Sequence, residues 1–320
     1  MGKEGSLAYQ MMKALQGVFR PGHSSREDRK HRRTEYIRGI STMRSMVADA
    51  FGFARWIHGA YPEIHLLRQV TPEVAQAYLD ELVRRDVSGG RIGRVTATLR
   101  KLDAACRRTS AFAADAPQLL PVAEKGGMRG FHSDPRPVPY EDEDADRIVA
   151  HVKERDPQVG MLLELMRVAG LRVSEAAFLR ICDMDLDAMT ITLKGAVNHT
   201  KGGRPREISI ARENRPVLVA LMELGSRHPD GHVFTSRRSL ASRARVWVRK
   251  ACEAFGIEPL GTHGLRKTFA TQEFCEMMGA GMGEKASVRA VARQLGHCRT
   301  SVVKQSYLSP EVLFSAREEP

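Results

Sequence analysis

The residues best able to do chemistry lie in five short segments in the second half of the chain. The segments are AGLRVSE with Arg172, TKGGRPR with Lys201, THGLRKTFA with His263 and Arg266, QLGHCRTS with His297, and KQSYLSP with Tyr307. Taken singly, each residue has an ordinary interpretation: Arg172 would form a surface salt bridge with Glu175, and Lys201 would be an unpaired surface lysine. Together they combine cations that can hold an anion with a phenol that can act as a nucleophile.

One of these segments places two cations at the start of a predicted helix. His263 and Arg266 are three residues apart, so both side chains project from one face of the helix. The first turn of a helix carries the positive end of its dipole and unpaired N–H groups, which favour an anion. This pair by itself is common and would not define a site.

In this order the five segments resemble the tyrosine recombinase, or phage integrase, family. The resemblance covers about residues 140 to 310, that is, the part of the chain with all five segments. It implies a catalytic domain of this family that breaks and rejoins DNA without a metal or another cofactor. The N-terminal third is similar to the family's helical, SAM-like core-binding domain in helicity, charge and position, although no motif supports it.

The resemblance implies a role for each cation. Arg172 and Arg266 would each present a fork of donors to the non-bridging oxygens of a phosphate, where charge accumulates during attack. Lys201 would protonate the departing 5′-oxygen. Lys194 also lies near the predicted hairpin, and Lys201, directly before the glycines, fits the family pattern better.

The resemblance also implies roles for the remaining site residues. Tyr307 would be the nucleophile that forms a 3′-phosphotyrosyl link and so conserves the bond energy. His263 would accept the phenol proton or hydrogen-bond the phosphate, and His297 would assist phosphate binding or position the tyrosine. Glu175 would orient these active-site side chains without contacting the DNA itself. The position after Arg266, often histidine in the family, is Lys267 here, so no such histidine is assigned.

Hydrophobic periodicity and the positions of Gly and Pro predict the secondary structure. They indicate an α+β fold that is mainly α, with a small antiparallel β element. MTITLK and REISI alternate in hydrophobicity and flank a long basic loop, which predicts a hairpin. In the second half, a helix is predicted at 157–169 and ends at Gly170, and a short helix follows Ser174. Further helices are predicted near 211–225, 239–255, 263–278, 286–295 and 300–307. The segment EMMGAGMGEKASVRA predicts an enlarged loop over about 277–287, and it lacks the spacing of a phosphate-binding loop.

The N-terminal third is predicted to be helical and strongly basic. Residues 1–110 hold 20 Lys and Arg against 11 Asp and Glu, a net of +9 out of the chain's +12. Apolar residues from Ile37 to Trp56 show helical spacing, Thr71 and Pro72 mark a helix start, and a third helix runs from about 91 to 108. That helix carries a basic stripe opposite its apolar face. The residues predicted to contact DNA are Arg91, Arg94, Lys101 and Arg108 on this helix, and Arg204 in the hairpin loop.

Composition shifts divide the chain into four regions. We predict an extension over 1–30 that could form a helix, a core-binding domain over 31–112, a linker over 113–139 and a catalytic domain over 140–320. The linker is rich in Pro and Gly and has little periodicity. The acidic run from Glu141 to Asp146 then begins a helix; metal binding is an alternative interpretation, but capping and solvation are more common for carboxylates there.

Composition excludes several classes of protein. With 42% apolar and 28% charged residues the chain is globular, and no apolar run reaches the ~18 residues of a membrane span. The first twenty residues lack an apolar signal region, and the five cysteines form no CxxC pair. We therefore expect a cytoplasmic, nucleoid-associated protein without a disulfide framework or a structural metal site.

The sequence thus predicts a site-specific DNA recombinase that forms a homotetramer on double-stranded DNA and exchanges strands through a Holliday junction. Accessory DNA-bending or excision factors are possible partners. Alternatives are a non-catalytic DNA-binding protein derived from an integrase and a type IB topoisomerase-like enzyme. A metal-dependent nuclease is disfavoured because the dense carboxylates lie apart from the basic segments.

Overall fold

The computed structural model describes residues 5–22, 36–108, 138–195, 205–297, 299–308 and 312–313. The chain divides into two compact units, Met1–Asp134 and Pro135–Pro320. Among the described residues, the fold is helical apart from one three-stranded antiparallel sheet in the second unit, and so the predicted mainly α, α+β class is confirmed. No helix in these ranges combines the length and apolar character needed to cross a bilayer.

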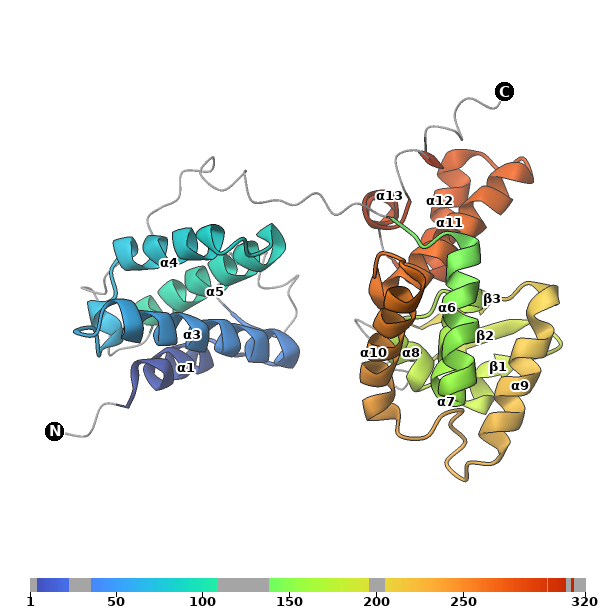
Figure 1. Cartoon of the computed structure of the whole chain (residues 1–320), viewed down its shortest axis with the longest axis horizontal. Helices are drawn as coiled ribbons and strands as arrows, with labels where there is room; N and C mark the ends of the chain where they lie inside the picture. Colours follow the sequence, from blue (N-terminus) through green and yellow to red (C-terminus); the bar gives the residue numbers. More distant parts are fainter. Residues whose placement is uncertain are drawn as a thin grey trace. The chain divides into compact units, whose positions relative to one another are not determined.

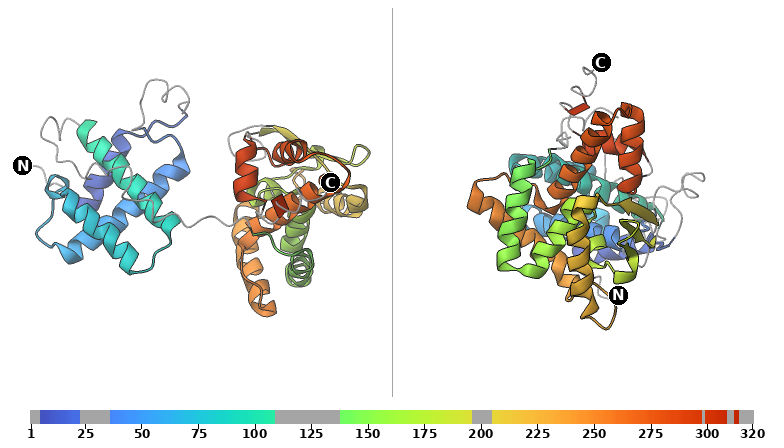
Figure 2. Two further views of the ribbon diagram at one scale, coloured as in Figure 1. Left: turned by 90° about the horizontal axis from the view of Figure 1, so that it is seen from above. Right: turned by 90° about the vertical axis from the view of Figure 1, so that its right-hand side faces the viewer.

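The first unit is a bundle of helices that cross one another (Figures 1 and 2). Its elements are α1 (Leu7–Gly17), α3 (Ile40–Ala60), η1 (Leu67–Gln69), α4 (Pro72–Arg84) and α5 (Gly89–Arg108). Thr71 and Pro72 begin α4 as predicted, because proline at the first helical position loses no hydrogen bond. The segment before residue 30 also forms a helix, α1, whose N-cap Ser6 accepts a hydrogen bond from the backbone N–H of Tyr9.

The start of α3 differs from the helix predicted around Ile37. Ile37 instead forms an isolated parallel bridge with Phe19, and its N–H donates to the carbonyl oxygen of Val18 at 2.9 Å. Gly39 has extended backbone angles, so the helix begins only at Ile40. Burial of the Ile37 side chain against the core of this unit therefore overrides the helical spacing that led to the prediction.

The second unit places a small sheet beside a group of helices (Figure 1). The helices are α6 (Asp142–Arg155), α7 (Pro157–Ala169), α8 (Val173–Ala177), α9 (Arg215–Ser226), α10 (Arg237–Phe255), α11 (Gly261–Gly279), α12 (Glu284–Gln294) and α13 (Thr300–Ser306), with 3-10 turns η4 (Ile181–Asp183) and η6 (Arg212–Asn214). The acidic run begins α6, and Gly170 ends α7 in the left-handed conformation at φ +57°. These helix boundaries follow from dipole charge and from glycine's tolerance of positive φ.

The sheet contains β1 (Met184–Asp185), β2 (Thr190–Leu193) and β3 (Arg206–Ser209) in the order β1-β2-β3. The predicted hairpin is confirmed: β2 and β3 are antiparallel, with Thr190 opposite Ser209 and Leu193 opposite Arg206. Strand β1 was not predicted, because two residues are too short to show a period. The loop between β2 and β3 lies largely outside the described residues.

Helix α11 lies between two hydrophobic clusters and so carries apolar side chains on more than one face. Leu265 belongs to the main core of the second unit, whereas Phe269 and Phe274 belong to a second cluster with residues of α12 and α13. A helix that packs against neighbours on both sides also buries its polar side chains. The helix also continues to Gly279, and α12 begins at Glu284, so the enlarged loop predicted over 277–287 is wrong: most of its residues extend the two helices.

Candidate active site

Arg266 is the centre of the site, and its side chain is fully buried in α11. Its Nη1 donates to the carbonyl oxygen of Gly170, at the end of α7, and its Nη2 donates to that of Leu295, after α12, at 2.6 Å. These carbonyls are left unpaired where helices end, so they can accept bonds from a buried cation. Backbone from two other helices thus fixes the guanidinium.

Tyr307 follows α13 and points its hydroxyl at this guanidinium. The Nε of Arg266 lies 3.4 Å from the hydroxyl oxygen of Tyr307, although the two residues are 41 positions apart. The tyrosine ring also lies beside two imidazoles, with centroid distances of 5.3 Å to His263 and 5.0 Å to His297. The side chain is only 3% exposed. The structure therefore brings together four of the six residues predicted to be catalytic, and Arg172 joins them through Glu175.

Arg172 and Glu175 form the ion pair expected from their spacing, but the carboxylate is buried. Glu175 is 0% exposed and accepts hydrogen bonds from the backbone N–H of Arg172 at 2.9 Å and from its Nη1 at 2.8 Å. Its Oε2 also lies 3.8 Å from Nη1 of Arg266. The interpretation as a surface salt bridge is thus wrong for Glu175, which links the two arginines from inside the protein.

Arg206, the first residue of β3, is a further member of the site that the sequence analysis did not single out. Its Nη1 and Nη2 donate to the two carboxylate oxygens of Glu175 at 3.1 and 2.7 Å, and its Nε donates to the carbonyl oxygen of Gln294 at 2.8 Å. The strand alternation did carry a signal, because Arg206 shares a face with the buried Ile208 and Ile210. A charged residue in that inward series indicates a buried partner.

The charges of the site shift several pKa values. Burial alone would raise the pKa of Glu175, but hydrogen bonds and charge from Arg206 and Arg172 lower it to about 2. Partial burial, and then the neighbouring cations, lower the pKa of His263 and of His297 to about 4. Burial lowers the pKa of Arg266 to about 10. At neutral pH the Glu175 carboxylate and Arg266 are therefore charged, and both imidazoles are neutral.

His297 faces the site with an unused nitrogen. Its Nε2 atom is buried and has no hydrogen-bond partner among the described residues. A buried polar atom without a hydrogen bond lowers the stability of the fold, and a bound ligand that hydrogen-bonds to it would remove this cost. The preceding Gly296 has φ +69°, and a Cβ there would come 2.9 Å from Cδ of Arg206. Glycine at this position therefore lets the arginine side chain pass.

The structure describes only some of the remaining predicted residues. Lys201 and Arg204 lie outside the described residues, as does most of the predicted linker. The alternative lysine, Lys194, has its Nζ 4.0 Å from Oδ1 of Asp183. The other four predicted DNA contacts, Arg91, Arg94, Lys101 and Arg108, all belong to α5 in the first unit.

Arg94 and Arg108 of α5 have partners within the first unit. Arg94 donates from Nε and Nη2 to the carboxylate of Asp49, which is buried in α3, at 3.0 and 2.9 Å. Arg108 lies over the ring of Tyr36 at 4.9 Å. The predicted basic stripe thus exists on α5, and Arg94 and Arg108 are held by contacts within the bundle.

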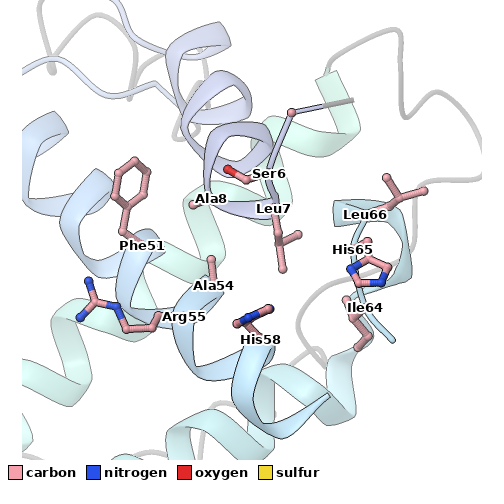
Figure 3. Close-up of a pocket in the computed structure, with 11 residues that line it drawn as sticks. Ser6, Leu7, Ala8, Phe51, Ala54, Arg55, His58, Ile64, His65 and Leu66 are labelled. Atoms are coloured by element: carbon pink, nitrogen blue, oxygen red, sulfur yellow. The ribbon is translucent and has the colours of Figure 1, made fainter. Parts of the chain in front are cut away.

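The first unit also has a pocket of about 610 Å³ at the start of α1 (Figure 3). Arg55 and His58 of α3 line it together with His65 and apolar side chains. None of the residues predicted to do chemistry lies there. Over the part of the chain that the structure describes, no three His, Cys, Asp or Glu side chains converge as metal ligands would.

Comparison with known proteins gives a match to a family model over residues 140–312, described as the phage integrase family. Among curated proteins, tyrosine recombinase XerD of Xanthomonas axonopodis pv. citri is 27% identical over 286 residues, covering 82% of this chain and 85% of that protein. Tyrosine recombinase XerC of Bacillus subtilis is 30% identical over 167 residues, covering 48% of this chain and 50% of that protein.

Solved structures share the fold at low sequence identity. XerH site-specific recombinase bound to a palindromic difH substrate, in a post-cleavage complex, has a TM-score of 0.63 at 15% identity and covers 88% of this chain and 80% of that one. A lambda integrase dimer bound to a core site has a TM-score of 0.61 at 16% identity, with 88% and 92% covered. The Tn1549 transposon integrase with transposon right end DNA has a TM-score of 0.61 at 14% identity, with 97% and 98% covered.

Proposed function

Because the chain belongs to the phage integrase family, we propose that it is a site-specific DNA recombinase that cleaves and rejoins DNA through a phosphotyrosyl intermediate. The observation that carries this proposal is the contact between Arg266 and Tyr307. A nucleophilic hydroxyl next to a guanidinium that can bind a phosphate is the arrangement that attack on a phosphodiester requires.

The two arginines of the site would bind the scissile phosphate. Arg172 is 20% exposed in its side chain, whereas Arg266 is anchored by two backbone carbonyls. Each Nη of Arg266 carries a second N–H beyond the one given to a carbonyl, so the anchored guanidinium can still donate to an anion. Glu175 holds Arg172 and Arg266 close together and so reduces the cost of placing several cations side by side.

The reaction would start with attack by the Tyr307 oxygen on phosphorus, with loss of its phenolic proton. The bond between phosphorus and the 5′-oxygen then breaks, and the 3′-phosphate remains joined to the tyrosine. The neutral imidazoles of His263 and His297 can accept a hydrogen bond or a proton there, because their pKa values of about 4 keep them unprotonated at pH 7. Lys201 would protonate the departing 5′-oxygen, and Lys194 is the alternative donor.

The first unit would hold the DNA backbone. Arg94 lines a hollow of about 230 Å³ together with the hydroxyl-bearing Ser41, Thr42 and Ser45 near the start of α3. Hydroxyls and guanidiniums at a helix start are common contacts to phosphate oxygens. Arg91, Lys101 and Arg108 on α5 would extend this interaction along the backbone.

The assembly is proposed from the resemblance to the family. Four protomers on two DNA sites would exchange strands in pairs through a Holliday junction, in the cytoplasm and in association with the nucleoid. Among the solved structures with this fold, one is named a site-specific recombinase and another a transposon integrase, and site-specific strand exchange is the role that we propose for this chain. Accessory bending or excision factors would then select the direction of exchange.

The proposal is tested by trapping the covalent intermediate. The purified chain would be incubated with a pool of nicked duplexes with randomised half-sites, and protein–DNA adducts that survive denaturing detergent would be isolated and sequenced. We expect adducts enriched in one sequence, and none with Tyr307→Phe.

Other outcomes would favour the alternatives. Adducts without sequence preference, together with relaxation of supercoiled DNA, would indicate a topoisomerase-like enzyme. Sequence-specific binding with no adduct under any condition would indicate a non-catalytic DNA-binding protein. A reaction that depends on added divalent metal and leaves no covalent adduct would indicate a nuclease.

A further inference from the structure

We infer that Arg206 is a positioning residue that occupies the Glu175 carboxylate and so leaves Arg172 free to bind the scissile phosphate. The inference rests on the proposed function and adds a residue to it. It follows from how three guanidiniums share one buried carboxylate.

Glu175 meets Arg206 and Arg172 in different ways. Arg206 uses both of its Nη groups, one on each carboxylate oxygen, at 3.1 and 2.7 Å, which is the two-bond geometry in which Arg–carboxylate pairs are strongest. The Arg172 guanidinium gives Glu175 only its Nη1, at 2.8 Å. The Nε and Nη2 atoms of Arg172 have no hydrogen-bond partner in the ranges that the structure describes.

The Arg206 side chain is fixed at both ends of its guanidinium. It is 8% exposed, and its Nε donates to the carbonyl oxygen of Gln294 at 2.8 Å. Gly296, one residue before His297, leaves the space through which it passes. Arg206 therefore connects the start of β3 to Glu175 and to the turn that carries His297. Over the residues that the structure describes, its hydrogen bonds go to Glu175 and Gln294, and none goes to Tyr307 or to an imidazole of the site.

Loss of Arg206 would leave the carboxylate with its strongest partner missing. Glu175 is fully buried, and an unpaired buried carboxylate is costly, so it would recruit a second donor from the nearest guanidinium that has one. That guanidinium is Arg172, because Arg266 is already held by two backbone carbonyls. Arg172 would then turn toward Glu175 and away from the DNA.

The test compares single-turnover cleavage of the enriched nicked duplex by wild type, Arg206→Met, Arg206→Lys and the exposed control Arg212→Ala, with DNA affinity measured separately. We expect Arg206→Met to slow adduct formation at saturating DNA by about ten- to a hundredfold, as small displacements of a catalytic group do. Its DNA dissociation constant should change far less than its cleavage rate relative to Arg212→Ala, because Arg206 would not contact DNA and Arg172 supplies only one of many phosphate contacts.

A double variant separates positioning from a general structural effect. If Glu175 draws Arg172 away, then adding Glu175→Gln to Arg206→Met removes the charge that draws it and should restore cleavage by at least about threefold over Arg206→Met alone. A merely structural role predicts that the double variant is slower than either single one. Should Arg206→Met fail to unfold cooperatively, the same comparison is made with Arg206→Lys, which keeps the charge but offers one bond.

Three results would overturn the inference. The first is a cleavage rate for Arg206→Met within about twofold of that of wild type. The second is a variant whose DNA affinity falls while its cleavage rate at saturating DNA does not. The third is a double variant that cleaves more slowly than Arg206→Met alone. Adduct formation by wild type and by Arg212→Ala establishes that the proposed function stands in each of these cases. If wild type itself forms no adduct, the proposed function fails, and the role of Arg206 in it fails as well.

Discussion

Replacement of Glu175 by alanine should destabilise the second unit by several kcal/mol. The carboxylate accepts four hydrogen bonds, three of them from guanidiniums, and it is fully buried. Its pKa of about 2, against an ordinary value of 4.5, corresponds to about 3 kcal/mol of stability at neutral pH. Removal of one partner from a buried ion pair typically costs about 3–5 kcal/mol, which agrees with this figure.

The sign of the pH dependence follows from the direction of the shift. A carboxyl whose pKa is lower in the folded state stabilises the fold above its unfolded pKa, and this stability is lost as the pH falls from about 4.5 toward 2. The cost of Glu175→Ala should therefore shrink from about 3 kcal/mol at pH 7 to about half of that at pH 3.

The assay is urea unfolding read by tryptophan fluorescence. The chain has two tryptophans, one in each unit, so a Trp56→Phe background lets Trp247 report the second unit alone. The control is Glu253→Ala, which removes an exposed i,i+4 pair with Arg249 and should cost less than about 0.5 kcal/mol. A cost for Glu175→Ala no larger than that of Glu253→Ala, or one that does not change between pH 7 and pH 3, would refute the reasoning.

Three further predictions concern backbone, protonation and the first unit. Gly296→Ala should slow adduct formation by about tenfold more than Gly281→Ala. Both glycines have positive φ, but only a Cβ at position 296 would meet an arginine side chain, at 2.9 Å. Equal rates for the two variants would contradict this prediction. In NMR titrations, the imidazole signals of His263 and His297 should stay those of neutral rings down to about pH 5, since their pKa values are about 4, and a midpoint near 6.5 would be inconsistent with the site. Asp49→Ala should lower the stability of the first unit by about 1–2 kcal/mol, because it removes a buried partner of α5, and unchanged urea unfolding of that unit would count against it.

Local sequence signals predicted most elements of the second unit. Proline at the first helical position and glycine in the left-handed conformation set the ends of α7 at Pro157 and Gly170. The alternation in MTITLK and REISI predicted the paired strands. These signals act within a few residues, and so they remain visible without tertiary structure.

Tertiary burial accounts for what the sequence did not reveal. The spacing of Arg172 and Glu175 predicted their ion pair, but not that Glu175 is buried between three guanidiniums that come from α11, β3 and the start of α8. Nothing local indicates that Arg266 is enclosed by helix ends that lie far away in the chain. The bridge that removes Ile37 from α3 likewise depends on a partner in a different segment.

The most direct test of the account is to identify the residue that carries DNA in the trapped adduct. Protease digestion and mass spectrometry of the adduct on the enriched duplex should find a nucleotide attached through its 3′-phosphate to the peptide that contains Tyr307. Attachment to any other residue, or an undiminished adduct with Tyr307→Phe, would contradict the proposed chemistry.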